Sequence, residues 1–334
     1  MKSDNGVVDL VSVELPRKLS VAALLQPLGM RAGRVGHGEV HAHHGEILQG
    51  VFYSSEGVLE QGLVTLPCPL YYTRARFRPL RSGPLTVQPG ERPRARTAAR
   101  LALDALGKIG WGGSVRIETD VPPAWGCGSS TSDVLSTIRA VADAFGTTLE
   151  PYWLARLAVA AETASDSVMF EPDRAVLFAQ RRGSLLRDLG GPLPRARVLG
   201  FNTDPGYGGL ETLKLPLCPY SSWEAEAFQG LLGLLRHAVE HGDPQLLGRV
   251  ATASTVINQR HRPKPLMPEL LRIQKATGAV GTQSAHSGTV AGFLFKPGPG
   301  ADDRMEHARA LLRRAGVKLT WEFSTVYADQ EAGR

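Results

Sequence analysis

One short run of small residues limits the fold of this chain more than any other feature: Gly126-Cys127-Gly128-Ser129-Ser130-Thr131. An alternating segment at 114–119 precedes the run and an amphipathic segment at 133–145 follows it, which predicts a strand, a tight loop and a helix. Small residues let backbone N–H groups approach an anion at a helix N-terminus, where the helix dipole favours negative charge. The loop therefore predicts phosphate binding, with helix capping by its hydroxyls as the structural alternative. No lysine follows as in a Walker motif, which excludes an ordinary P-loop.

The composition is that of a globular protein. The 334 residues are 43% hydrophobic and 21% charged, which argues against wholesale disorder and against a membrane bundle. At roughly 100–200 residues per domain, this length predicts about two domains. The net charge of +6 favours an anionic ligand such as a nucleotide phosphate. We expect no nucleic-acid binding, because the basic residues are scattered except at 92–96 and no basic strand is interleaved with aromatic residues.

The cysteines and the apolar segments indicate the compartment. Cys68, Cys127 and Cys218 are far apart and form no CxxC pair, so neither a disulfide framework nor a zinc knuckle is expected. The first residues lack a continuous apolar segment, and no stretch approaches the roughly 18 apolar residues of a spanning helix. The sequence predicts a cytoplasmic protein with no membrane partner.

The periodicity predicts strands and helices in both halves of the chain. A short helix or an irregular extension is expected at 21–28, a turn-rich exposed segment at 81–94, and a loop at 204–209. The first half is interpreted as one domain, 1–190, and the second half as another, 191–334. Strands are expected at 61–67, 70–77, 114–119, 175–178, 197–201, 288–295 and 318–323, and helices at 97–106, 133–145, 151–164, 223–241, 244–259, 268–277 and 303–315.

Three motifs together resemble the GHMP kinases, the superfamily of galactokinase, homoserine kinase and mevalonate kinase. The segment Pro123–Ser132 is similar to the Pro-x-x-x-Gly-Leu-Gly-Ser-Ser-Ala motif of these enzymes. An early segment, Gly45–Gly50, precedes this motif and a late segment, Gly281–Thr289, follows it, in the order expected for the superfamily. The resemblance implies an α+β, two-domain GHMP kinase fold, with a ribosomal protein S5 domain 2-like N-terminal domain and a ferredoxin-like C-terminal domain. It also implies ATP and Mg²⁺ as cofactors.

Within the superfamily, the chain resembles the L-threonine kinase branch, which serves cobalamin side-chain assembly. The resemblance rests on the run Gly45–Gly50, on the following Val64–Pro67, and on Ala285–Gly288 in the late motif. Members of that branch carry Pro-Ala-Ser-Cys before the Gly-Glu pair, where this chain has His41-Ala42-His43-His44. A zinc site is a weak alternative for these histidines, since their spacing matches no metal motif.

The resemblance assigns roles to residues of this chain. Glu162 and Ser130 are the expected Mg²⁺ ligands. Asp166 is the expected catalytic base or orienting group, and Asp173 is the alternative. Without the neighbouring motifs, these carboxylates would be interpreted as a solvated helical residue and turn residues. Cys127 is interpreted as a packing residue, because no base accompanies it. ATP contacts are expected from Pro123, Gly126, Cys127, Gly128, Ser129, Ser130 and Thr131, and acceptor contacts from His43, His44, Glu46, Gln49, His286, Ser287 and Gly288.

The predicted function is an ATP-dependent kinase that phosphorylates the side-chain hydroxyl of a small amino acid, with L-threonine as the first candidate. Homoserine, serine or a hydroxylated amino acid of a specialised pathway are alternative acceptors. A regulator that binds ATP without turnover, or a decarboxylase of the diphosphomevalonate type, would have the same fold with a different function. The sequence does not determine the oligomeric state, although a homodimer is compatible with it.

Overall fold

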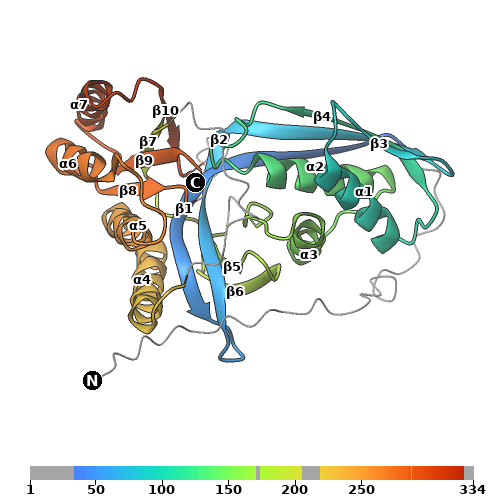
Figure 1. Cartoon of the computed structure of the whole chain (residues 1–334), viewed down its shortest axis with the longest axis horizontal. Coiled ribbons are helices and arrows are strands. Elements are labelled where there is room, and N and C mark those ends of the chain that lie inside the picture. The colour runs from blue at the N-terminus through green and yellow to red at the C-terminus, as the bar shows by residue number, and fades with distance from the viewer. Residues whose placement is uncertain (1–33, 171–173, 205–218, 287, 327–334) are drawn as a thin grey trace.

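The computed structural model describes residues 34–170, 174–204, 219–286 and 288–326 (Figure 1). The element expected at 21–28, most of the loop at 204–209, Asp173, Cys218 and Ser287 lie outside these residues.

The described residues form one ten-stranded sheet with helices packed against it (Figure 1). The strands are β1 (Gly36–Tyr53), β2 (Leu59–Leu80), β3 (Leu85–Gln88), β4 (Gly112–Thr119), β5 (Val176–Ala179), β6 (Ser184–Asp188), β7 (Arg197–Asn202), β8 (Gly281–Ser284), β9 (Val290–Phe295) and β10 (Thr320–Ser324). Their order across the sheet is β10-β7-β9-β8-β1-β2-β4-β3, and β5 and β6 attach beside β2. All pairs are antiparallel except β3 with β4.

The long hairpin of β1 and β2 connects the two halves of the sheet. β1 pairs with β2 along most of its length and meets β8 at Glu46, opposite Ser284. The prediction of two separate strands at 61–67 and 70–77 was wrong, because β2 runs without a break through Pro67 and Pro69. The pairing of β1 with this segment is irregular, with register shifts between His41 and Leu48. Prolines are tolerated at such irregular positions because a regular hydrogen-bond ladder is already absent there.

Three helices cover one face of the N-terminal half of the sheet: α1 (Pro93–Ala105), α2 (Ser129–Ala144) and α3 (Pro151–Glu162). Two glycines let the α2 backbone lie directly on β1. A Cβ on Gly36 would sit 2.1 Å from the Ala140 carbonyl oxygen, and one on Gly38 would sit 2.1 Å from that of Ser136. The opposite face of β2, β4 and β3 carries alternating exposed side chains and is not covered by any described helix (Figure 1).

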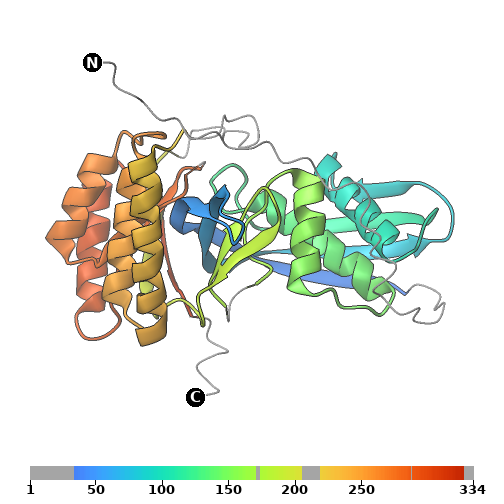
Figure 2. The same ribbon diagram turned by 90° about the horizontal axis from the view of Figure 1, so that it is seen from below.

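The C-terminal half places its helices in a second layer: α4 (Ser222–His241), α5 (Pro244–Asn258), α6 (Met267–Thr277) and α7 (Ala301–Arg314). Figure 2 shows these helices beside one another against the C-terminal strands. Phe228, Leu235 and Val250 bury the helix faces against β1, and Phe293 and Met305 belong to a separate buried cluster with α6 and α7. Burial of such apolar area is the main favourable contribution to folding.

The expected helices after residue 90 are confirmed, with ends that differ by a few residues. α1 and α2 both begin four residues earlier than expected, and α2 therefore includes the serines and the threonine of the Gly/Ser loop. One long strand, β1, and three short strands, β3, β6 and β8, were missed. The segment at 81–94, expected to be exposed turns, contains β3, which pairs in parallel with β4. Its Val87 is 6% exposed because the side chain packs in the core cluster that includes α1. β6 and β8 have five and four residues, and each pairs with its neighbour in the chain, β5 and β9 respectively.

The mixed α+β class predicted from the sequence is confirmed. The domain division near residue 190 stays a prediction, and β1 and β8 join the two halves within one sheet. In the described part of the chain, no helix combines the length and the apolar character that crossing a membrane requires.

Candidate active site

The Gly/Ser loop leads into the open N-terminus of α2. Gly128, the residue before the helix, has φ of 72°, and a Cβ there would sit 2.3 Å from the His43 ring. Among the described residues no side chain caps the helix, although its first four residues, 129–132, all carry hydroxyls. The free N–H groups of the first turn therefore keep their capacity to bind an anion. The capping alternative does not describe Ser130 and Thr131, since their hydroxyls bond to carboxylates instead.

Glu162, the last residue of α3, lies against this helix N-terminus and is 3% exposed. The Ser130 hydroxyl donates to its Oε2 and the Thr131 hydroxyl to its Oε1, both at 2.8 Å. Burial raises the pKa of Glu162 to about 7. The two hydrogen bonds act to lower this pKa, and the negative charge of Asp166 acts to raise it. Glu162 is thus a buried, oxygen-surrounded carboxylate and not a solvated helical residue.

Asp166 lies beside Glu162 and contacts a histidine from β1. Its Oδ2 is 2.8 Å from His43 Nε2 and 3.3 Å from Thr131 Oγ1. The Gly45 N–H donates to His43 Nδ1 at 3.1 Å, which assigns the Nε2 proton of the neutral imidazole to the hydrogen bond with Asp166. Burial alone would raise the pKa of Asp166, but His43 and Thr131 outweigh it and hold this pKa below its usual value.

The two carboxylates share one hydroxyl. Thr131 lies within hydrogen-bond distance of both Glu162 and Asp166, yet its single proton satisfies one of them at a time. Two acidic groups held this close repel one another when both are ionised. A divalent cation with oxygen ligands would remove this repulsion, and the hydroxyl and carboxylate oxygens here suit Mg²⁺.

Arg94 of α1 is a site residue that the sequence analysis missed. Its Nη1 donates to Ser130 Oγ at 3.0 Å, and the adjacent Arg92 forms an ion pair with Asp133 of α2. The signal was the basic cluster at 92–96, which had been weighed only as a nucleic-acid contact. In the fold, Arg92 and Arg94 of this cluster lie beside the first turns of α2.

The late motif packs directly on the Gly/Ser loop. A Cβ on Gly288 would sit 2.2 Å from the Trp125 carbonyl oxygen, and one on Gly126 would sit 2.7 Å from the Ala285 side chain. The N–H groups of Thr289 and Val290 both donate to that Trp125 oxygen, at 2.8 and 3.0 Å. Residues more than 150 positions apart in the sequence therefore form one wall of the candidate site.

A second group of charges lies on the same wall. His286 Nδ1 is 2.8 Å from Glu46 Oε2, and these side chains are 7% and 8% exposed. Lys264 Nζ donates to the Gly288 carbonyl oxygen. Burial lowers the pKa of Lys264 to about 8, although the charge of Glu46 opposes the shift. Lys264, which the sequence analysis also missed, joins Glu46 and His286 as groups that can bind a zwitterion.

Some predicted contact residues lie behind this surface. His44 is fully buried, bonded through Nδ1 to Gln283 Oε1 at 2.9 Å and packed against Trp321 and Phe323. The expected contact between His44 and the acceptor is therefore corrected, because the ring is buried in the core beneath β1. Gln49 lies next to α5, where its N–H donates to Ser254 Oγ.

Of the residues expected to contact ATP, Cys127 is buried and Pro123 is exposed. Cys127 is 1% exposed, and burial raises the pKa of its thiol, in keeping with a packing residue. Pro123 is exposed at the start of the loop.

Comparisons with known proteins identify a matching family model and similar proteins. Residues 94–170 match the family model of the GHMP kinases N terminal domain. The chain is 27% identical over 296 residues to an L-threonine kinase of Salmonella typhimurium strain LT2, covering 87% of this chain and 91% of that protein. It is also 27% identical to an L-threonine kinase of Citrobacter freundii, over 75% of this chain and 83% of that protein. The fold resembles homoserine kinase from Cytophaga hutchinsonii, with a TM-score of 0.62 at 14% identity, covering 90% of this chain and 97% of that one.

Proposed function

Because the chain belongs to the GHMP kinase superfamily and is a phosphotransferase with an alcohol acceptor, we propose that it transfers the γ-phosphoryl group of ATP to the hydroxyl of L-threonine. One observation carries the proposal. The contacts Ser130–Glu162, Glu162–Thr131, Thr131–Asp166 and Asp166–His43 form an unbroken set at the uncapped N-terminus of α2. This set supports the proposal because phosphate binding, metal binding and acceptor activation in a kinase require such groups next to one another.

The Gly/Ser loop and α2 bind the triphosphate in this proposal. The backbone N–H groups of 126–130 and the helix dipole attract the phosphate oxygens. Arg94 adds a guanidinium that reaches the same turn through Ser130. Positioning and charge stabilisation supply most of the rate enhancement in phosphoryl transfer, so a preformed set of donors is the central requirement.

Ser130 and Glu162 are the residues that would hold Mg²⁺, and the fit rests on the chemistry of their oxygens. Glu162 is buried with no cationic partner among its hydrogen bonds in the described residues, and its raised pKa reflects that lack of compensation. When bound, Mg²⁺ neutralises charge on the phosphate oxygens.

Asp166 acts on the acceptor. The acceptor hydroxyl oxygen forms a bond to the γ-phosphorus, the bond from that phosphorus to the oxygen of ADP breaks, and the hydroxyl proton passes to Asp166. The hydrogen bond from His43 holds the carboxylate ionised and fixes its direction. A carboxylate with a low pKa is a weak base, so it orients the hydroxyl and accepts the proton late, as suits a loose transition state.

The other end of the acceptor lies toward Glu46 and Lys264. A carboxylate binds the α-ammonium group of an amino acid, and an ammonium group binds its α-carboxylate. Glu46 and Lys264 offer this pair on one wall of the site, with His286 orienting Glu46. Two relatives named L-threonine kinase support threonine as the acceptor. The segment 41–44, which departs from the pattern of that branch, keeps homoserine, serine and other hydroxylated amino acids as the second candidates.

The test is ADP release from purified protein with ATP and Mg²⁺. The acceptor panel contains L-threonine, D-threonine, L-serine, L-homoserine and no acceptor, and mass spectrometry identifies each product. Release that depends on L-threonine, with O-phospho-L-threonine as product, supports the proposal. Preference for another hydroxy amino acid would identify that compound as the acceptor instead of L-threonine. ATP binding with no turnover supports a regulator of the same fold. CO₂ release from a diphosphorylated acid would instead support a decarboxylase.

A further inference from the structure

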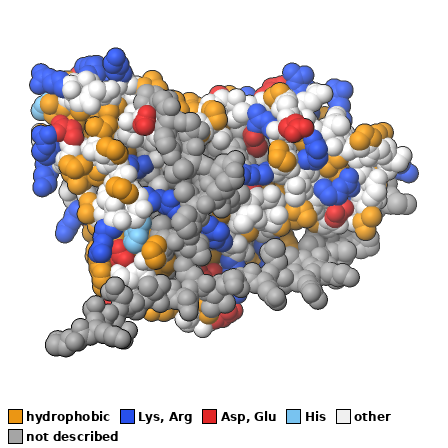
Figure 3. Space-filling view, viewed as in Figure 1, with side chains coloured by type: hydrophobic (Ala, Val, Ile, Leu, Met, Phe, Trp, Pro, Cys, Tyr) orange, Lys and Arg blue, Asp and Glu red, His pale blue; other side chains and the backbone are white. Residues whose placement is uncertain are grey.

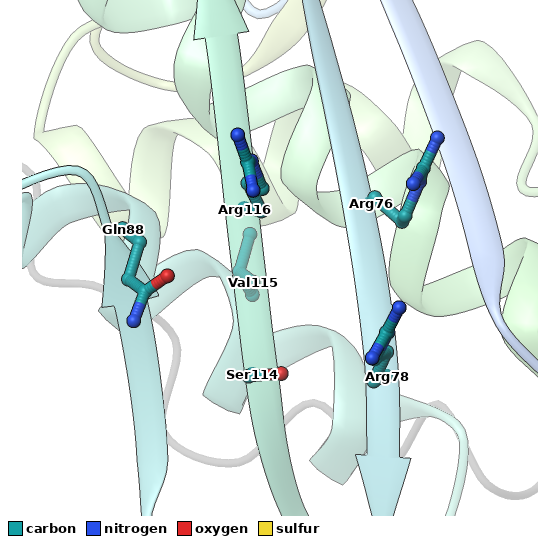
Figure 4. Close-up of a pocket in the computed structure, with 6 residues that line it drawn as sticks. All are labelled: Arg76, Arg78, Gln88, Ser114, Val115 and Arg116. Carbon is teal, nitrogen blue, oxygen red and sulfur yellow. The ribbon is translucent and has the colours of Figure 1, made fainter.

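The uncovered face of the sheet carries a concentration of arginines away from the Gly/Ser loop. Arg76 and Arg78 project from β2, and Arg116 projects from β4 beside them (Figure 4). Alternation along β2 buries Ala75 and Phe77 under the helices and places the arginines on the opposite face. The space-filling view shows several cationic side chains over this half of the molecule (Figure 3).

The cross-strand register makes this cluster unfavourable without a ligand. Arg76 lies directly opposite Arg116, and like charges in that position destabilise a sheet. The neighbouring pair on the same strands is balanced, since Arg74 lies opposite Glu118 and bonds Glu39 at 2.5 Å. Arg116 contacts Glu118 at 3.2 Å, but no carboxylate of the described ranges forms an ion pair with Arg76 or Arg78.

The arginines also line a concave site. A pocket of about 180 Å³ is bounded by Arg76, Arg78, Gln88, Ser114, Val115 and Arg116. Gln88 from β3 and Ser114 from β4 add an amide and a hydroxyl to the guanidinium groups, so its polar side chains supply mostly hydrogen-bond donors. A site with several donors, two uncompensated cations and no carboxylate is complementary to a small dianion.

We propose that this pocket binds a small phosphate-bearing anion, as a second site separate from the kinase centre. Guanidinium groups bind phosphate oxygens in bidentate geometry, and a phosphomonoester carries close to two negative charges near neutral pH. Inorganic phosphate and an O-phospho amino acid share this chemistry. The pocket has no aromatic lining on which nucleotide bases could stack, which argues for a small anion over a single-stranded nucleic acid. The proposal does not depend on the identity of the kinase acceptor.

The test is calorimetric titration of the full chain with inorganic phosphate at low ionic strength, and separately with O-phospho-L-threonine. The variant Arg76→Gln/Arg78→Gln removes the uncompensated cations. Arg74→Gln, on the same strand but paired with Glu39, is the matched control. Arg94→Gln weakens phosphate binding at the kinase centre, so that the pocket is measured in isolation.

We expect at least tenfold weaker phosphate binding by Arg76→Gln/Arg78→Gln than by the wild type in the Arg94→Gln background, and less than a threefold change for Arg74→Gln. Tighter binding of O-phospho-L-threonine than of phosphate identifies an organic phosphomonoester as the ligand, and equal binding identifies free phosphate. Equal binding by all variants, or no saturable binding, overturns the proposal. Tighter binding of a 20-nucleotide single strand than of either small anion, lost in the double variant, also overturns it.

A stability measurement serves as a second readout. Because Arg76 and Arg116 repel one another, the double variant should unfold at the same temperature as the wild type or a higher one in phosphate-free buffer. Phosphate should raise the unfolding temperature of the wild type more than that of the variant. A lower unfolding temperature of the variant without phosphate would show that these arginines stabilise the fold, which contradicts the proposal.

Discussion

His43 and Asp166 are joined by a hydrogen bond of 2.8 Å from Nε2 to Oδ2, and the Gly45 N–H determines which nitrogen of the ring donates. Replacing His43 with Asn should lower kcat by about tenfold to 100-fold, because the carboxylate loses both its orientation and its partner. The KM for ATP should change less than threefold. Steady-state kinetics measure this split, and Asp166→Asn should lower kcat further.

A matched control for His43→Asn is His241→Asn, which alters an exposed histidine at the end of α4. It should leave both constants unchanged. A His43→Asn enzyme with wild-type kcat would remove His43 from the site and leave Asp166 to act without it.

Glu162→Gln should raise the Mg²⁺ concentration needed for half-maximal activity by at least tenfold. The amide keeps the shape and accepts one hydrogen bond, but it loses the charge that attracts a divalent cation. Titration of Mg²⁺ at fixed ATP measures the effect, with Glu118→Gln on the exposed edge of β4 as control. An unchanged Mg²⁺ requirement would assign the metal to other residues.

Gly288→Ala should weaken the contact between the two halves of the site. A Cβ at this residue would sit 2.2 Å from the Trp125 carbonyl oxygen, so the late motif must move off the Gly/Ser loop. The expected loss of unfolding free energy is about 1–3 kcal/mol, together with weaker ATP binding. Chemical denaturation and nucleotide titration test both parts.

Gly230→Ala is the control for that substitution. Gly230 lies within α4, and a Cβ there meets no atom within 4 Å. The change should stabilise the protein by roughly 0.5–1 kcal/mol, since alanine favours a helix over glycine. If both alanine variants behaved alike, close packing at Gly288 would not explain the result.

Stability should fall as the pH falls from about 6.5 to about 4. Burial lowers the pKa of His44 to about 4, whereas the unfolded chain binds its proton near the usual value of 6.5. In this range the unfolded state binds more protons, so acid favours unfolding. The full contribution of His44 is on the order of 3 kcal/mol. Denaturation at pH 7.5, 6, 5 and 4 measures the slope.

The variant His44→Gln should show a flatter profile over this range, and His307→Gln, an exposed histidine of α7, should follow the wild type. A wild-type slope in His44→Gln would mean that another group controls the acid transition.

The local pattern of the sequence determined the helices and the chemistry of the loop. Apolar residues at helical spacing predicted α4 and α5 to within a residue or two, because an amphipathic helix reports its own buried face. The Gly/Ser run predicted an anion site, and the family resemblance predicted that Glu162 and Ser130 belong together. These inferences depend on residues close in the chain or on a family resemblance.

Only the tertiary structure decided the contacts between distant residues. It placed His43 on Asp166 and His44 in the core, although the two histidines are adjacent, because neighbouring residues of a strand face opposite sides. It brought Lys264 to Gly288, and it placed Arg94 of the basic cluster 92–96 on Ser130, a partner that the cluster alone does not indicate. It also set Arg76 opposite Arg116, since strand register depends on pairing across the sheet and not on either strand alone.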